Sequence, residues 1–224
     1  MAAKDAPSAA AMPLLEARSI TKSFLGVTAL DHVDFTLNRG EIHALLGENG
    51  AGKSTLIKIL TGAYHGFDGS ILLEGQPIAP ASVAEAQTLG IGTVYQEVNL
   101  LENLTVAENL FLGRQPKRFG LVDRGRMEKD AAKLLSRYGL AIDVGAPLSA
   151  YSVAIRQIIA IARAVDLSGK VLVLDEPTAS LDAREVEMLF GVLRQLKAEG
   201  LGIVVITHFL DQVYAIADCA TVLR

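Results

Sequence analysis

The fold of this chain is decided by nine residues, Gly47-Glu-Asn-Gly-Ala-Gly-Lys-Ser-Thr55. They match the pattern G-x-x-x-x-G-K-[ST], in which glycines let backbone N–H groups approach a polyphosphate. Lys53 supplies a cation for the β- and γ-phosphates, and Ser54 offers its hydroxyl to Mg²⁺. The stretch predicts a phosphate-binding loop in which every residue contributes to nucleotide binding: Gly47, Glu48, Asn49, Gly50, Ala51, Gly52, Lys53, Ser54 and Thr55.

The flanking segments supply the setting that this motif requires. Residues 41–46 have the composition of a buried strand, and residues 54–60 have the apolar spacing of a helix. A chance match in a glycine-rich loop is the alternative, but it does not require a strand before the loop and a helix after it. The sequence therefore predicts an α/β fold with a P-loop NTPase (RecA-like) core.

Composition limits the remaining possibilities. The chain has 224 residues, of which 50% are apolar, and its net charge is −4. No apolar run approaches the length of about 18 residues that a membrane helix needs, and the acidic balance argues against nucleic acid as a partner. The single cysteine, Cys219, cannot form an internal disulfide. Its apolar neighbours predict a small core residue rather than a reactive thiol.

The order of the predicted elements divides the chain. Residues 1–13 resemble a flexible tail, and residues 14–224 form one domain. Apolar alternation at Val33, Phe35 and Leu37 and a short hairpin near residues 71–75 predict an antiparallel β subdomain beside the loop. Helical spacing then predicts an inserted α-helical subdomain at about 97–165, behind an N-cap at Ser152. The ATPase core comprises residues 14–96 and 166–224.

Polar residues end the predicted core strands. Asp175 closes the apolar strand 170–175, where a carboxylate can hold Mg²⁺, and Glu176 can act as the general base for an attacking water. Gln96 follows a strand and can orient water and metal, while His208 follows the strand 203–206 and can donate to the γ-phosphate. The alternative is that these are ordinary polar residues at strand exits. We predict Glu176, His208, Gln96 and Lys53 as catalytic residues and Ser54, Gln96 and Asp175 as metal ligands.

Five motifs in this order resemble those of the ATP-binding subunits of ABC transporters, and the resemblance covers nearly all of residues 14–224. The corresponding positions are the phosphate loop at 47–55, the Q-loop at Gln96, the second phosphate motif with its catalytic glutamate at 171–176, the D-loop at 179–182 and the switch histidine at His208. Phe24 stands where the family places an aromatic ring that stacks on adenine, although tyrosine is commoner there. The resemblance implies ATP and Mg²⁺ as cofactors.

Some stretches are similar to one branch of the family. Residues 47–62, 94–100 and 109–113 resemble bacterial monosaccharide importers, and residues 115–121 and 207–214 are most similar to a galactofuranose importer. This implies ATP hydrolysis coupled to sugar import by a chain bound peripherally at the cytoplasmic face of the inner membrane. The implied partners are a second ATP-binding half, with this chain as the N-terminal half, transmembrane permease subunits and, indirectly, a periplasmic sugar-binding protein.

The other possible class is an ABC-type ATPase outside transport, acting in translation or DNA maintenance. A DNA-maintenance ATPase would carry a long coiled coil in place of the helical insert, and the insert shows no heptads. A translation ATPase would tend to show basic arms for RNA, which this acidic sequence lacks.

The sequence departs from the family at one motif. The signature Leu-Ser-Gly-Gly-Gln, which binds the γ-phosphate of an ATP held by the opposite half, corresponds here to Tyr151-Ser-Val-Ala-Ile155. Val153 and Ala154 replace the glycines and add Cβ atoms where backbone should approach phosphate. Because such residues disfavour positive φ, we also expect a backbone penalty at these two positions.

Overall fold

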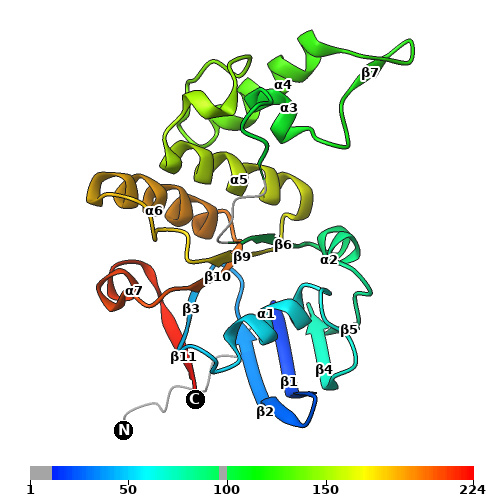
Figure 1. Ribbon diagram of the computed structural model, residues 1–224, viewed down its shortest axis with the longest axis vertical. Helices are drawn as coiled ribbons and strands as arrows, with labels where there is room; N and C mark the ends of the chain where they lie inside the picture. Colours follow the sequence, from blue (N-terminus) through cyan, green and yellow to red (C-terminus); the bar gives the residue numbers. More distant parts are fainter. Residues whose placement is uncertain (1–11, 96–99) are drawn as a thin grey trace, which may run out of the picture.

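The structure is a computed structural model that describes residues 12–95 and 100–224. Gln96 and residues 1–11 of the predicted tail lie outside the described residues. Two sheets and a group of helices form three layers along the long axis of the molecule (Figure 1). Within the two described ranges, no helix has both the length and the apolar character needed to cross a membrane.

A five-stranded parallel sheet forms the centre, with the strand order β11-β3-β10-β9-β6. Its strands are β11 (Cys219–Leu223), β3 (Ile42–Gly47), β10 (Gly202–Ile206), β9 (Val171–Asp175) and β6 (Ile91–Val94). The near-continuous apolar sequences of β9 and β10 are explained by burial of both sheet faces. Leu172 and Leu174 of β9 pack into the core on the helical side, whereas Val171 and Val173 pack into the core on the opposite side.

The opposite face of this sheet is covered by an antiparallel sheet and one helix. The antiparallel sheet has the order β2-β1-β4-β5 and comprises β2 (Val27–Leu37), β1 (Leu15–Phe24), β4 (Asp68–Leu73) and β5 (Gln76–Ile78). Helix α1 (Lys53–Leu60) buries Leu56 and Leu60 in the core between the two sheets. The predicted antiparallel β subdomain and the helix after the phosphate loop are therefore confirmed.

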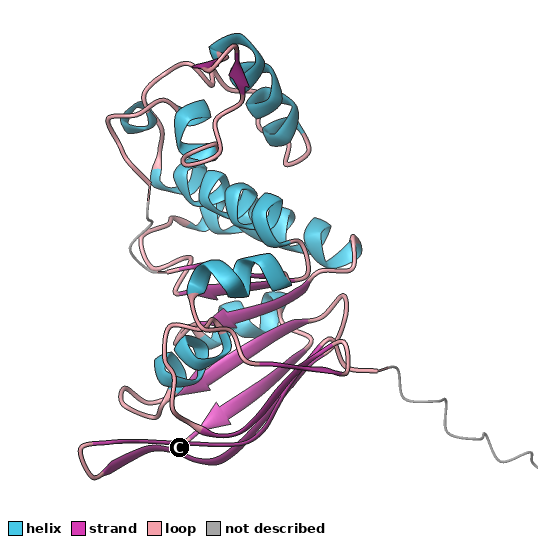
Figure 2. Cartoon of the chain, turned by 90° about the vertical axis from the view of Figure 1, so that its right-hand side faces the viewer, coloured by secondary structure: helices cyan, strands magenta, loops and turns pink. Residues whose placement is uncertain are grey.

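The remaining helices lie mainly on the other face, with the insert at one end of the molecule (Figures 1 and 2). They are α2 (Val83–Leu89), α3 (Val106–Leu110), α4 (Arg124–Ser136), α5 (Val153–Ser168), α6 (Ala183–Ala198) and α7 (Leu210–Ile216), with a 3-10 turn at Leu148–Ala150 and a hairpin of β7 (Lys117–Arg118) and β8 (Leu121–Val122). Met127 of α4 and Ile158 of α5 are buried, as helical spacing predicts, but Val153 at the start of α5 is exposed. The predicted boundary at residue 165 falls inside helix α5, which ends at Ser168. This helix contacts both α4 in the insert and β9 in the sheet.

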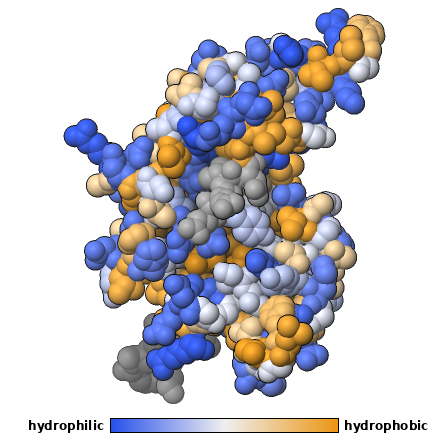
Figure 3. All heavy atoms as spheres, in the orientation of Figure 1, coloured by the Kyte–Doolittle hydropathy of each residue, from blue (hydrophilic) through white to orange (hydrophobic). Residues whose placement is uncertain are grey.

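Apolar side chains project from two turns of the surface (Figure 3). The β7–β8 hairpin exposes Phe119, Leu121 and Val122, and the turn between β1 and β2 exposes Leu25 and Val27. This β7–β8 hairpin was not predicted from the sequence.

The prediction for Cys219 is wrong. Cys219 is exposed, and within β11 only Leu223 is buried. Strand β11 pairs with β3 and forms an edge of the parallel sheet, so its apolar residues are not covered on both faces. Val222 is 59% exposed in the same strand, so the apolar sequence of this stretch does not mean that its residues are buried.

Candidate nucleotide site

The phosphate loop connects the carboxyl end of β3 to the amino end of α1. Gly52 is the N-cap of α1 with a φ of 91°, and a Cβ there would lie 2.5 Å from the carbonyl oxygen of Ala29. Gly50 has a φ of 89°, but a Cβ there would meet no described atom within 4 Å. One glycine is therefore required by packing under the loop, and the other lies on the open side, where a side chain would occupy the space for a phosphate.

The Lys53 ammonium and the N-terminus of α1 form a positive environment that can bind an anion. The Lys53 ammonium donates hydrogen bonds to the carbonyl oxygens of Gly47 at 2.7 Å and Glu48 at 2.9 Å. This holds its charge over the loop. Helix α1 has no side-chain cap at its N-terminus and no acidic residue in its first turn. Its N–H groups and positive dipole end therefore remain available to a phosphate.

The loop and the end of β9 enclose a cleft of about 290 Å³. The cleft is lined by Asn49, Gly50, Gly52, Lys53, Ser54, Thr55, Asp175, Glu176 and Ile206. The phosphate loop contributes backbone N–H groups and an ammonium to this lining, and the end of β9 contributes two carboxylates. A hydroxyl and a carboxylate are suitable oxygen ligands for Mg²⁺, so the residues present fit a magnesium-bound polyphosphate.

The charge of Asp175 is disfavoured in the isolated protein. Burial and the neighbouring charge of Glu176 raise the pKa of Asp175, while Lys53 and Lys58 act in the opposite direction. A divalent cation beside a carboxylate favours its ionised form. The effect of Lys58 on Asp175 was not predicted from the sequence. Its position four residues after Ser54 places both residues on the same side of α1, and this spacing could have indicated that Lys58 lies near the site.

Glu176 and His208 contact each other. His208 Nδ1 lies 3.1 Å from Glu176 Oε1, and the Glu176 N–H donates to the carbonyl oxygen of Ile206 at 2.9 Å. Glu176 has a φ of 47°, a conformation that costs a non-glycine residue free energy and occurs often at functional sites. The strand ends thus hold the glutamate in a defined position between the histidine and the cleft.

Phe24 is the predicted contact for the adenine ring. Phe24, at the end of β1, is 39% exposed and lies edge-on to Tyr64, with 5.4 Å between ring centroids. It does not line the cleft, and its adenine contact stays a prediction. Tyr64 was missed, because nothing in the local pattern connects two aromatic residues forty positions apart. Gln96 lies outside the described residues.

The signature segment differs from the expectation in its backbone. Ser152 is the N-cap of α5, as predicted, but its side chain makes no capping hydrogen bond. Val153 and Ala154 are helical, and neither has a positive φ. The expected backbone penalty is therefore wrong. Ala154 is fully buried and Val153 is 46% exposed, so Val153 is the one of the two whose added side chain is accessible at the surface.

The comparisons with known proteins agree with this geometry. A family model described as ABC transporter matches residues 30–179. The chain is 63% identical over 211 residues to the galactofuranose transporter ATP-binding protein YtfR of Escherichia coli (strain K12), covering 94% of this chain and 42% of that protein. It is 58% identical over 212 residues to the ribose import ATP-binding protein RbsA 1 of Rubrobacter xylanophilus, with 95% and 42% covered.

A solved structure gives the same result for the fold. The crystal structure of a nucleotide-free ATP-binding cassette from an ABC transporter superposes with a TM-score of 0.84 at 30% identity, covering 95% of this chain and 88% of that one. The predicted fold class is thereby confirmed. The chain spans 42% of the length of each of these two curated relatives. On the family match and on this structural agreement, the chain belongs to the ABC transporter family, as an ATP-binding cassette.

Proposed function

We propose that this chain binds ATP with Mg²⁺ and hydrolyses it to drive import of a monosaccharide, with galactofuranose as the leading candidate. The observation that carries the proposal is the cleft in which the phosphate loop faces Asp175 and Glu176. The sugar rests on the names of the relatives, one of which is called a galactofuranose transporter protein and another a ribose import protein.

Each site residue has a proposed role. Lys53 and the loop N–H groups hold the β- and γ-phosphates, and Ser54, Asp175 and Gln96 hold Mg²⁺, which supplies charge neutralisation on the phosphates. Glu176 accepts a proton from the attacking water. His208 positions the glutamate through the contact at Oε1 and donates to the γ-phosphate, and the ring of Phe24 stacks on adenine.

The proposed partners follow from the same assignment. A second ATP-binding half completes the site, transmembrane permease subunits carry the sugar, and a periplasmic sugar-binding protein delivers it. The chain then acts peripherally at the cytoplasmic face of the membrane. We also propose that residues 14–96 and 166–224 act as the ATPase core and residues 97–165 as a helical subdomain, with α5 as the element they share.

The test is reconstitution of this chain with a second ATP-binding half, permease subunits and a sugar-binding protein. We expect ATP-dependent uptake of labelled galactofuranose into vesicles, and no uptake with the Glu176→Gln variant. A panel of labelled pentoses and hexoses identifies the sugar. ATP hydrolysis by the assembled complex without uptake of any sugar in the panel would refute the transport assignment while leaving the ATPase assignment intact.

A further inference from the structure

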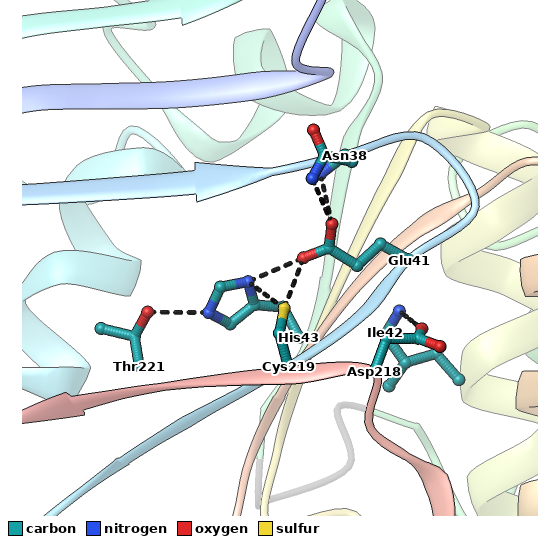
Figure 4. Close-up of polar contacts among 7 residues, drawn as sticks. All are labelled: Asn38, Glu41, Ile42, His43, Asp218, Cys219 and Thr221. Carbon is teal, nitrogen blue, oxygen red and sulfur yellow. Dashed lines mark hydrogen bonds and ion pairs between the residues drawn. The ribbon is translucent and has the colours of Figure 1, made fainter. Parts of the chain in front are cut away.

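A second polar cluster lies on the parallel sheet, at the edge formed by β11. His43 of β3 is the register partner of Cys219 of β11, and Glu41 precedes His43 by two residues. Because side chains two residues apart along an extended strand point to the same face, Glu41, His43 and Cys219 converge on one face of the sheet (Figure 4). None of the three lines the nucleotide cleft.

Three potential metal-ligand atoms of this cluster are mutual neighbours. His43 Nδ1 is 2.9 Å from Glu41 Oε1, Cys219 Sγ is 2.8 Å from Glu41 Oε1, and Cys219 Sγ is 3.2 Å from His43 Nδ1. Ligand atoms on a tetrahedral Zn²⁺ ion are separated by about 3.3–3.7 Å, given bonds of about 2.0–2.3 Å. The three atoms need to separate by about half an ångström to accept the ion.

Neighbouring residues already orient two of these ligands. His43 Nε2 lies 2.8 Å from Thr221 Oγ1, a hydroxyl that can accept a hydrogen bond from Nε2–H once an ion replaces the contact of Nδ1 with Glu41 and takes the Nδ1 lone pair. Asn38 Nδ2 donates to Glu41 Oε2 at 2.5 Å, which leaves Oε1 facing the other two atoms. Such outer hydrogen bonds are characteristic of histidine and carboxylate ligands in metal sites.

The site is closed on one side and open on the other. Glu41 and His43 are buried, at 8% and 6% exposure, whereas Cys219 is exposed. An ion can therefore enter beside the thiol, where water can take the fourth position. Asp218 is not a further ligand, because its carboxylate accepts a hydrogen bond from the Ile42 N–H at 2.8 Å and pairs with Lys197.

We propose that Glu41, His43 and Cys219 form a Zn²⁺-binding site at the β3–β11 edge, separate from the nucleotide cleft. A ligand set of imidazole nitrogen, thiolate sulfur and carboxylate oxygen is typical of zinc. On binding, the thiol proton is released to solvent and a sulfur–zinc bond forms. In the metal-free protein the thiol keeps this proton, because burial and the neighbouring Glu41 raise the pKa of Cys219 to about 12.

The single cysteine makes the test specific. Cobalt(II) is the probe, since a thiolate-to-cobalt charge-transfer band in this chain can arise only at Cys219. We expect the band to saturate at one equivalent of Co²⁺ and to be displaced by one equivalent of Zn²⁺. Cys219→Ser should abolish the band. Asp175→Asn, which removes a carboxylate of the nucleotide cleft, should leave it unchanged.

Two further variants separate a built site from a thiol that binds metal alone. Glu41→Gln keeps the side-chain shape, and Thr221→Val removes the partner of His43 Nε2; each should weaken Zn²⁺ binding about tenfold or more. Circular dichroism and the thermal midpoint of each metal-free variant establish that it is folded. Absence of the band in the wild-type protein overturns the proposal, as does equal Zn²⁺ affinity of wild type, Glu41→Gln and Thr221→Val.

Discussion

At the scale of single residues, the nucleotide site depends on a few charged groups at fixed positions. Lys53 is held by two carbonyl oxygens of its own loop, and Glu176 is held by the backbone of Ile206 and by the ring of His208. The phosphate-binding Lys53 and the proposed general base Glu176 therefore line the same cleft. Nucleotide binding and hydrolysis can therefore be tested separately by mutating Lys53 and Glu176 one at a time.

The first prediction concerns nucleotide binding by Lys53. Lys53→Ala removes the ammonium over the loop, and we expect Mg-ATP affinity to fall by about tenfold or more, the equivalent of a charge-assisted hydrogen bond. Calorimetric titration of the folded variant measures this. Lys129→Ala removes an equal charge from the exposed face of α4 and serves as the control. Equal affinities in the two variants would mean that Lys53 does not contact nucleotide.

The second prediction concerns ATP hydrolysis and the roles of Glu176 and His208. Glu176→Gln should bind Mg-ATP as the wild type does, but its kcat for hydrolysis in the assembled transporter should fall by about a hundredfold, within the range of general-base catalysis. His208→Ala should lower kcat less, because the glutamate remains. If Glu176→Gln turns over ATP at the wild-type rate, Glu176 is not the base.

At the scale of elements, helix α6 shows how local sequence determines a boundary. The Asp182 carboxylate accepts hydrogen bonds from the N–H groups of Arg184 at 2.8 Å and Glu185 at 2.9 Å, and the Glu185 side chain accepts one from the Asp182 N–H. This reciprocal capping box follows the D-loop directly. The cap places the first residue of α6 at Ala183.

The third prediction tests this cap. Asp182→Ala should lower the free energy of unfolding by about 1 kcal/mol, because two N–H groups of the first turn lose their acceptor. Urea denaturation followed by circular dichroism gives the difference. Asp182→Ser provides the control, since a hydroxyl can still cap the helix, and it should recover most of the loss. Equal destabilisation by both substitutions would assign the effect to something other than capping.

The fourth prediction concerns the contact between β3, α6 and the residue before β11. Burial acts to raise the pKa of Asp218, but the Ile42 N–H and the Lys197 ammonium bring it below its ordinary value. The folded-state pKa is thus lower than that of the unfolded chain. The stability this contributes is fully present above the unfolded pKa and is lost as the pH falls through the folded pKa.

Asp218→Asn should therefore flatten the dependence of unfolding free energy on pH at acid pH, below about pH 4, the ordinary pKa of an aspartate. Urea denaturation of both proteins across this range measures the slope. Asp31→Asn, at an exposed position in β2, is the control and should leave the slope unchanged. A variant slope at Asp218 equal to that of the wild type would contradict the shift in pKa.

The elements that the sequence predicts well are those whose pattern is local. Strands β9 and β10 are apolar throughout, and α6 has both a cap and an apolar face, so no distant contact is needed to recognise them. Helices α2, α3 and α7 have seven, five and seven residues, too few turns for a periodic signal. Strand β11 is apolar like the central strands, but its edge position follows from pairing with β3.

The same distinction holds within the site. The phosphate loop, Asp175 and Glu176 are recognisable because each is adjacent in sequence to the element that positions it. The contact of Glu176 with His208 and the convergence of Glu41, His43 and Cys219 are set by strand order across more than thirty residues. Residue type predicted the chemistry in the first case, but only topology reveals the second.

At the scale of the whole molecule, two features determine how this chain would act with a second ATP-binding half. Its own cleft has a complete phosphate loop, Asp175 and Glu176. Its signature segment, in contrast, has Val153 at the first position of α5, 46% exposed, with Ala154 buried behind it. A nucleotide in the opposite half would therefore face a valine side chain where the family presents glycine.

The fifth prediction is functional asymmetry between the two ATP sites, and it rests on the proposed function. The site formed by this chain borrows its signature from the other half and should hydrolyse ATP. The opposite site borrows Tyr151-Ser-Val-Ala-Ile155, where Val153 displaces the γ-phosphate from its productive position, and it should mainly hold the halves together.

Single-turnover hydrolysis by the intact two-half protein distinguishes the sites. With Glu176→Gln in this half, we expect near-complete loss of product. Adding Val153→Gly to that variant should restore part of the product, because removing the side chain clears the approach to the α5 N-terminus, whose N–H groups can then bind the phosphate. Retention of about half the wild-type product with Glu176→Gln alone, as two equivalent sites would give, would show that Ser152 and the helix N-terminus suffice for catalysis and would refute the asymmetry.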